Sequence, residues 1–497
     1  MDSKETLSKI LSIEENFEVN ELRYMGVQVW PYYRTIFLDL FKNSTVSAAK
    51  RSSATEVNFG YRFSRKDTPK LPSEVFEGVH SLALQAGRSL GEQELFFLCD
   101  SRFQITHDKR FHTHKFFSPI YQSLPQGFKG KFLLSDTWPE KKIALIENPT
   151  EPNYRIDQDM SSLALLRSSI PLNHIHRDLF KFIHKEFPGL PLDYRAIEGV
   201  LQFICVTASY FKIILQEGRA RVSLSSVIPS IRTFAFIMGS RLAGVPSVEV
   251  QHGIGGGGEV HPVYNHWSVV PREGYHLLPK YFWCWGEKSK LGVAEWADKN
   301  DFHNAFVGGN PWISNIIQLT DEEKAKKTGG RKRILVSLQN YDIPNFLLNG
   351  IKHFRDHEWF FLCHPLHNHL FDRYKSHLNK HLGAFDNWSI SQSRKNEFYT
   401  LIKDATVLIT GFSTTAYEAL VFGVHTILIH ENSLFEINQY IKKGVFKYAG
   451  NFEELHQILM EMNFNQEETP FIESSNLGID YLLAIMGREE NMTPLTS

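Results

Sequence analysis

The chain has 497 residues, of which 42% are hydrophobic and 22% charged, as is ordinary for a folded protein with two or three domains. Its 54 Lys and Arg balance 55 Asp and Glu, so no overall basic excess indicates a nucleic-acid partner. The four cysteines are far apart and form no CxxC pair, which argues against a disulfide framework or a cysteine zinc site and favours a reducing compartment. The first residues lack the apolar core of a signal peptide, and no stretch approaches the ~20 apolar residues that span a bilayer. We expect a cytoplasmic protein with at most peripheral contact to the inner membrane.

Residues 1–75 are predicted to form an N-terminal helical segment followed by a polar, Ser- and Lys-rich linker from about residue 46. From residue 76 to 315, apolar strands alternate with helical stretches, a pattern that predicts a parallel sheet covered by helices. The expected strands of this domain are Glu94–Cys99, Lys142–Glu147, Val245–Val250, Tyr281–Trp285 and Ala305–Val307, and the clearest helices are Leu192–Gln216 and Ser230–Ala243.

A polar crossing, Gln318–Arg333, leads into a second alternating domain at 316–475, and residues 476–497 are interpreted as a C-terminal helix and tail. The expected strands of the second domain are Ile334–Leu338, Trp359–Cys363, Trp388–Ile390, Thr406–Ile409 and His425–Ile429, with a later helix at Phe452–Met462. The chain is therefore predicted to be an α/β protein of GT-B-like architecture. Two doubly wound, Rossmann-like parallel-sheet domains would face a cleft, with ligands at the carboxyl ends of the strands.

The stretch from Thr406 to Glu431 predicts a βαβ unit in which an apolar strand breaks at Gly411 and small hydroxyl residues open a helix. A helix start offers N–H groups and a positive dipole to an anion, although Ser and Thr are also common there as plain N-caps. A glutamate one turn further is a candidate for a sugar hydroxyl, and another glutamate follows the next strand. The candidate binding residues of this unit are Ser413, Thr414, Thr415, Glu418 and Glu431.

A QHG motif with His252 and Gly253 follows the predicted strand Val245–Val250 and precedes four consecutive glycines, 255–258. Such glycines let backbone approach a ligand closely or let a loop close over one. A histidine at the carboxyl end of a strand is well placed to donate to a phosphate or to transfer a proton. The alternative is a surface loop with a structural histidine, and the same loop carries the weaker candidates Glu259 and His261.

An HP motif, His364–Pro365, closes the predicted strand Trp359–Cys363, where the proline ends the strand and places the histidine at its tip. Candidates for a general base are three carboxylates that follow or lie within apolar strands, although such residues are often structural: Asp100, Asp136 and Glu249. The acidic pair at 157 and 159 has no preceding strand in the prediction and is interpreted as a solvated loop rather than a metal site. GGNP at 308–311 and SLQN at 337–340 are lesser signals, because each lies where a two-domain cleft would place backbone and polar contacts, although turn chemistry explains either adequately.

The order QHG, HP and hydroxyl cluster, over roughly residues 240–435, resembles GT-B glycosyltransferases of bacterial capsule and lipopolysaccharide synthesis. It is similar in particular to HP-containing sialyltransferase and Kdo-transferase-like groups, whose donor is a CMP-sugar. The resemblance implies nucleotide contacts from His364, Pro365 and the cluster at 413–415. Teichoic-acid-type polyol-phosphate polymerases also resemble this chain, but they usually carry Asp where Gly411 stands.

The resemblance implies a glycosyltransferase that moves a sugar from a nucleotide-activated donor to a growing glycan or lipid-linked acceptor. Helix dipole and imidazole would stabilise the leaving phosphate, so no metal or other cofactor is expected. A polysaccharide assembly complex is a further expected partner. Three alternatives stay open: a CDP-polyol phosphotransferase, a nucleotide-sugar epimerase or hydrolase of the same architecture, and a non-catalytic partner of such a complex.

Overall fold

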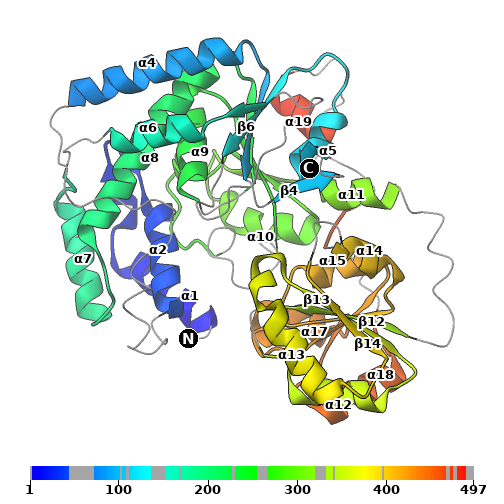
Figure 1. The fold of residues 1–497 in the computed structure, drawn as a ribbon. Coiled ribbons are helices and arrows are strands. Elements are labelled where there is room, and N and C mark those ends of the chain that lie inside the picture. The colour runs from blue at the N-terminus through cyan, green and yellow to red at the C-terminus, as the bar shows by residue number, and fades with distance from the viewer. Residues whose placement is uncertain are drawn as a thin grey trace. The chain divides into compact units, whose positions relative to one another are not determined.

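The computed structural model describes residues 3–43, 72–100, 103–107, 111–135, 153–166, 171–226, 230–253, 266–318, 332–339, 342–393, 397–465, 471–473 and 478–487. The chain divides into two compact units, each with its own parallel sheet (Figure 1). The first unit takes the chain as far as Trp312 and again from Ser475, and the second runs from Ile313 to Ser474. The predicted strand Lys142–Glu147, Asp136, the four glycines, Glu259 and His261 lie outside the described residues.

The first unit contains a seven-stranded sheet in the order β11-β10-β9-β8-β3-β6-β7, with every neighbouring pair parallel. Its strands are β3 Leu95–Asp100, β6 Gly130–Ser135, β7 Asn153–Arg155, β8 Val222–Ser225, β9 Ser247–Val250, β10 Tyr281–Cys284 and β11 Asn304–Val307. From β3 the chain winds to one edge through β6 and β7, then returns to the other side of β3 at β8. The strand order therefore reverses between β3 and β8, where ligands bind in open parallel sheets.

The helices of the first unit lie around this sheet and, in the case of α7, against the N-terminal segment (Figure 1). They are α4 Pro72–Leu90, α5 Phe117–Gln122, α6 Asp157–Leu165, α7 His174–Glu186, α8 Tyr194–Glu217, α9 Ile231–Ala243, α10 Glu287–Ala297, α11 Pro311–Gln318 at the unit boundary, and α19 Ile479–Ile485. Of the helices described, α8 alone is long and apolar enough to cross a membrane, and 72% of its most apolar window is buried inside the structure. It packs against α4 and α9, as a core helix does. The chain's return is fixed where Gly478 N–H donates to the carbonyl of Gly308 at 3.0 Å.

The N-terminal segment consists of α1 Ser3–Asn16, a 3-10 turn η1 Val19–Glu21, the short hairpin β1 Arg23–Tyr24 and β2 Val27–Gln28, and α2 Trp30–Asn43. A fully buried ion pair joins its two helices, with Arg34 Nη1 and Glu14 Oε1 2.7 Å apart. Glu14 also accepts from Trp30 Nε1 at 2.8 Å and from the backbone N–H of Ser268 at 3.0 Å. These donors offset the desolvation of the carboxylate, which is the condition for a buried ion pair to be tolerated.

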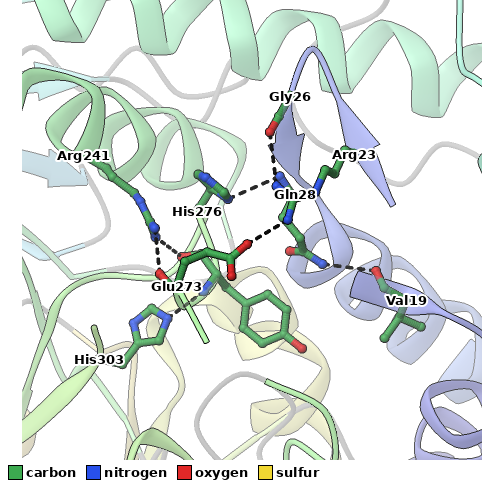
Figure 2. A network of polar contacts seen from close by, with 9 residues as sticks. Val19, Arg23, Gly26, Gln28, Arg241, Glu273, His276 and His303 are labelled. Carbon is green, nitrogen blue, oxygen red and sulfur yellow. Dashed lines mark hydrogen bonds and ion pairs between the residues drawn. The ribbon is translucent and has the colours of Figure 1, made fainter. Parts of the chain in front are cut away.

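A second polar network, on the segment that leads from the QHG loop to β10, is drawn in Figure 2. The Glu273 carboxylate accepts from Arg23 of the hairpin at 2.7 Å, and its backbone carbonyl accepts from Arg241 of α9, also at 2.7 Å. The Gln28 backbone N–H donates to His276 Nδ1 at 3.4 Å. The backbone N–H of Tyr275 donates to His303 Nε2 at 2.8 Å. Hydrogen bonds to the N-terminal hairpin, to α9 and to His303 therefore fix the segment that follows the QHG loop.

The second unit contains a six-stranded, all-parallel sheet in the order β14-β13-β12-β15-β16-β17. Its strands are β12 Arg333–Leu338, β13 Glu358–Cys363, β14 Trp388–Ser391, β15 Val407–Thr410, β16 His425–Leu428 and β17 Phe446–Tyr448. Its helices are α12 Asn345–His353, η5 Pro365–Leu370, α13 Phe371–Leu382, α14 Glu397–Asp404, α15 Thr415–Val421, α16 Ser433–Glu436, α17 Asn438–Lys442 and α18 Phe452–Glu461. Here the strand order reverses between β12 and β15.

The predicted fold class is confirmed, since the chain is an α/β protein with parallel sheets of seven and six strands. All four cysteines are buried. The interpretation of the acidic pair at 157 and 159 as a solvated loop is wrong. Strand β7 precedes it, Asp157 begins α6, and Asp159 is buried, where it accepts from the hydroxyls of Tyr210 at 2.6 Å and Tyr154 at 3.1 Å.

Candidate functional site

The carboxyl edge of the second sheet collects polar residues around the point where its strand order reverses. Gln339 follows β12, and the turn with Phe412 follows β15, the strand on the other side of that point. Gln339 Oε1 accepts the backbone N–H of Phe412 at 3.1 Å, so this side chain bridges the two strand ends. The SLQN motif, a lesser signal in the sequence, thus contributes a residue to this edge.

The predicted hydroxyl cluster lies at the same edge, and its three side chains are partly exposed. Helix α15 begins at Thr415 and is seven residues long, and Thr414 before it makes no capping bond with its side chain. Ser413 Oγ accepts the backbone N–H of Thr415 at 3.3 Å. The Thr415 hydroxyl is itself buried and has no hydrogen-bond partner among the described residues. Of the three hydroxyls, that of Ser413 therefore caps the turn.

His364 lies between the end of β13 at Cys363 and the start of η5 at Pro365, so the HP motif marks the end of the strand as predicted. The His364 ring is half-buried, and its centroid is 5.2 Å from that of His367. Burial and then the neighbouring His367 lower the pKa of His364 below its usual 6.5. At neutral pH the ring is thus an uncharged imidazole that can donate one hydrogen bond, rather than an imidazolium acid.

The two predicted glutamates lie in different surroundings. Glu418 is buried and accepts from the Tyr399 hydroxyl of α14 at 3.0 Å, so it makes an internal contact. Burial and then Glu418 raise the pKa of Tyr399 well above its usual value. Glu431 is exposed after β16, next to His430, whose ring centroid is 5.1 Å from that of Phe412. His430 is a second imidazole at this edge that sequence reasoning did not single out.

The carboxyl edge of the first sheet holds the other predicted candidates. Glu249 on β9 is fully buried beside Ser225 of β8, whose hydroxyl donates to Glu249 Oε2 at 2.8 Å. Glu249 Oε1 lies 3.9 Å from Nδ1 of His252, which is one-quarter exposed. This separation is too long for a hydrogen bond, so the two groups interact through charge alone. A carboxylate and an imidazole placed side by side are the two groups that a general base commonly combines.

The other QHG residues fix the turn that carries this histidine. Gln251 is buried, its Nε2 donates to the carbonyl of Gly253 at 2.7 Å, and its Oε1 accepts the backbone N–H of Trp285 at 2.7 Å. The glutamine thus joins the end of β9 to the end of β10. Asp100 ends β3 at the same edge and is also buried.

The GGNP motif proves to be a packing feature. A Cβ on Gly308 would lie 2.2 Å from the Trp283 ring, and Trp283 Nε1 donates to the carbonyl of Gly309 at 2.9 Å. Only glycine lets the backbone approach the indole this closely. As for metals, the described part of the chain contains no group of three or more His, Cys, Asp or Glu side chains placed to hold an ion.

These features define an α/β protein with two doubly wound parallel sheets, each with polar side chains at the reversal of its strand order. No protein-family model matches the chain, and a sequence comparison with curated proteins gives no match.

Three similar solved structures illustrate its resemblances. The UDP-GlcNAc 2-epimerase of Methanocaldococcus jannaschii is 14% identical with a TM-score of 0.49, covering 80% of this chain and 99% of its own. The Neisseria meningitidis UDP-GlcNAc 2-epimerase bound to UDP-GlcNAc is 12% identical with a TM-score of 0.46, covering 80% and 100%. The wall teichoic acid polymerase TagF is 11% identical with a TM-score of 0.43, covering 93% and 94%. Since all these scores lie below 0.5, the function proposed below rests on the residues of this chain.

Proposed function

We propose that this chain is a metal-independent glycosyltransferase that moves a sugar from a nucleotide-activated donor, with a CMP-sugar favoured, to a bacterial capsule or lipopolysaccharide glycan. The observation that carries the proposal is the reversal of strand order between β12 and β15. Gln339, the hydroxyl cluster at 413–415 and His364 all follow strands that end at this edge. In open parallel sheets, ligands bind outside the carboxyl ends of the strands at such a point.

The polar groups at this edge suit the phosphate of a nucleotide. Hydroxyls, backbone N–H groups and a neutral imidazole can all donate hydrogen bonds to an anion. The Thr415 hydroxyl is buried and has no partner within the described residues, while the nearby Glu418 is bonded to Tyr399 and Glu431 is exposed to solvent. The proposed nucleotide contacts are His364, Pro365, Gln339, Ser413, Thr414 and Thr415.

The proposed base is His252, with the buried carboxylate of Glu249 beside it. It takes the proton of an acceptor hydroxyl while that oxygen forms a bond to the anomeric carbon of the donor sugar. The bond from that carbon to the phosphate oxygen breaks, and the leaving phosphate keeps the electron pair. His364 and the hydroxyl cluster stabilise this developing charge by hydrogen bonding. Asp100 and Asp136 remain the other candidates for the base.

Thermal-shift measurements with CMP, CDP, UDP and GDP test the nucleotide site directly. A nucleotide present at 100 times its dissociation constant should add about 2.7 kcal/mol of apparent stability. The donor sugar is then identified by product analysis with the nucleotide that binds. His252→Gln should abolish transfer but leave the nucleotide shift intact. A chain that responds to none of the four nucleotides would refute the proposal.

A nucleotide-sugar epimerase is a second candidate, favoured by the buried carboxylates of Asp100 and Glu249 at one sheet edge, because epimerisation needs acid and base groups around the sugar. It would alter the donor sugar with no acceptor present. A CDP-polyol phosphotransferase would instead form a phosphodiester product. The proposal includes a cytoplasmic location with peripheral contact to the inner membrane or to a polysaccharide assembly complex.

A further inference from the structure

A second histidine of the first unit, His114, lies near the same phenylalanine ring as His252. His114 ends β5 Phe111–His114, which forms a hairpin with β4 Gln104–His107 between β3 and β6. Its Nδ1 accepts the backbone N–H groups of Phe116 at 3.3 Å and Phe117 at 3.2 Å, where α5 starts. Its own backbone N–H donates to Ser118 Oγ at 2.7 Å. The imidazole thus caps the helix, as a serine or aspartate side chain usually does.

This arrangement determines where the ring carries its proton. Because Nδ1 accepts two N–H groups, the proton of the neutral ring is on Nε2. Burial lowers the pKa of His114 to about 3, against the opposing charge of Asp100, so the ring is neutral at physiological pH. Nε2 is buried, and within the described ranges it has no hydrogen-bond partner. A buried N–H donor normally has a partner, so one from outside the protein chain is expected here.

His114 and the proposed base, His252, lie near the same aromatic ring. Its ring is stacked on that of Phe117, with centroids 4.2 Å apart, and its centroid is 6.0 Å from that of Phe103. The His252 centroid lies 5.6 Å from the same Phe103 ring. Both imidazoles therefore flank one phenylalanine, and Asp100 at the end of β3 acts electrostatically on His114.

Two other buried donors at this edge have no partner in the described part of the chain. They are Ser226 Oγ, directly after β8, and Trp285 Nε1, directly after β10. The edge thus combines uncharged donors with the buried carboxylates of Asp100 and Glu249. Carboxylates repel a phosphate but accept hydrogen bonds from hydroxyl groups, and the N–H and O–H donors serve the hydroxyl oxygens. This combination suits an uncharged polyhydroxyl ligand.

We propose that His114 binds the acceptor carbohydrate, with its Nε2–H donating to a hydroxyl oxygen at the carboxyl edge of the first sheet and Asp100 accepting from a neighbouring hydroxyl. This inference rests on the proposed glycosyltransferase function and adds a substrate-binding residue to it. The hydroxyl held in this way lies on the acceptor that His252 deprotonates.

The test uses two variants of the full-length chain that separate the two nitrogens. In His114→Asn, the side-chain oxygen takes the place of Nδ1 and still accepts from Phe116 and Phe117, but the Nε2–H donor is lost. In His114→Gln, the amide nitrogen reaches the place of Nε2 and keeps that donor. The probe is an array of neutral and acidic bacterial oligosaccharides, and binding of the neutral oligosaccharide that the wild type retains best is then measured by calorimetry.

Loss of one hydrogen bond predicts a roughly 3- to 10-fold weaker affinity of His114→Asn for that oligosaccharide, with His114→Gln close to wild type. The thermal shift of His114→Asn with nucleotide should equal that of the wild type, while its melting temperature should fall because the variant loses the packing of the ring on Phe117. Equal binding by wild type and His114→Asn would show that His114 is only a helix cap, and binding of no neutral oligosaccharide by the wild type would overturn the inference as well. The nucleotide shift is independent of these results, so failure of the proposed function is recognised separately.

Discussion

Replacing His364 with Asn should weaken nucleotide binding by roughly 10- to 150-fold. A hydrogen bond to a charged group contributes about 1.5–3 kcal/mol, and about 1.4 kcal/mol corresponds to a factor of ten in affinity. The Asn side chain is shorter than the imidazole, so it cannot reach a phosphate oxygen that the outer ring nitrogen of His364 contacts. It also cannot take up a proton. Calorimetric titration of wild type and variant with the nucleotide found by thermal shift measures the loss.

The pH dependence of binding provides a second, sharper readout of the same contact. In the free protein, burial and His367 hold the pKa of His364 below 6.5. A bound phosphate favours the imidazolium and raises this pKa in the complex. The additional binding energy is therefore fully present below the free pKa and is lost as pH rises through the pKa of the complex. Titrations in two buffers of different ionisation enthalpy should reveal proton uptake by the wild type in excess of that by His364→Asn.

His369→Asn is the matched control, because His369 lies on the same 3-10 segment and is exposed. This variant should bind the nucleotide with wild-type affinity and wild-type proton uptake. If His364→Asn also kept full affinity, or if both variants lost it equally, the specific phosphate contact assigned to His364 would be refuted.

Three further predictions concern stability and are measured by denaturant unfolding. Glu14→Gln leaves the Arg34 charge buried without its counterion and should lower the unfolding free energy by about 3–5 kcal/mol, so a loss below about 1 kcal/mol would contradict the ion pair's role. Buried His303 has its pKa lowered to about 3, so the unfolded chain binds more protons below pH 6.5 and stability falls as pH falls. Its share of the loss from pH 7 to pH 5 is about 2 kcal/mol, and His303→Asn should lack that share. Gly308→Ala should cost about 1–3 kcal/mol because its Cβ meets the Trp283 ring, whereas wild-type stability would show that the ring can move.

Several of the predicted strands contain a continuous apolar run, such as β10, β13 and β15. Strand β8 was not predicted, and its short sequence, VSLS, alternates apolar residues with serines, although all four residues are buried. The structure explains how these serines are tolerated. Ser223 Oγ lies 2.7 Å from Ser240 Oγ, and Ser225 donates to Glu249. These partners lie on α9 and β9, so the contacts that allow the two serines to be buried are not specified by the local sequence.

The same limit applies to the site. His252 and His364 could be proposed because each follows an apolar strand, and the carboxyl ends of parallel strands share one edge. The order of the strands within a sheet is not encoded locally, so the bridging position of Gln339 across the reversal was invisible. His114 had no sequence signal at all, because its significance depends on which ring nitrogen the start of α5 occupies.

Both sheets have the same winding, with the first strand of each placed between the second and the fourth, so topology alone does not distinguish their two reversal points. Their chemistry does. The first edge carries the buried carboxylates Asp100 and Glu249 beside imidazoles, a setting that attracts hydroxyl protons and disfavours anions. The second carries His364, a bridging amide and small hydroxyls, which donate to an anion. A reaction that removes a proton from a neutral hydroxyl and releases a phosphate requires both kinds of environment. The difference in charge between the two edges is therefore the physical basis for proposing the acceptor at the first edge and the nucleotide at the second.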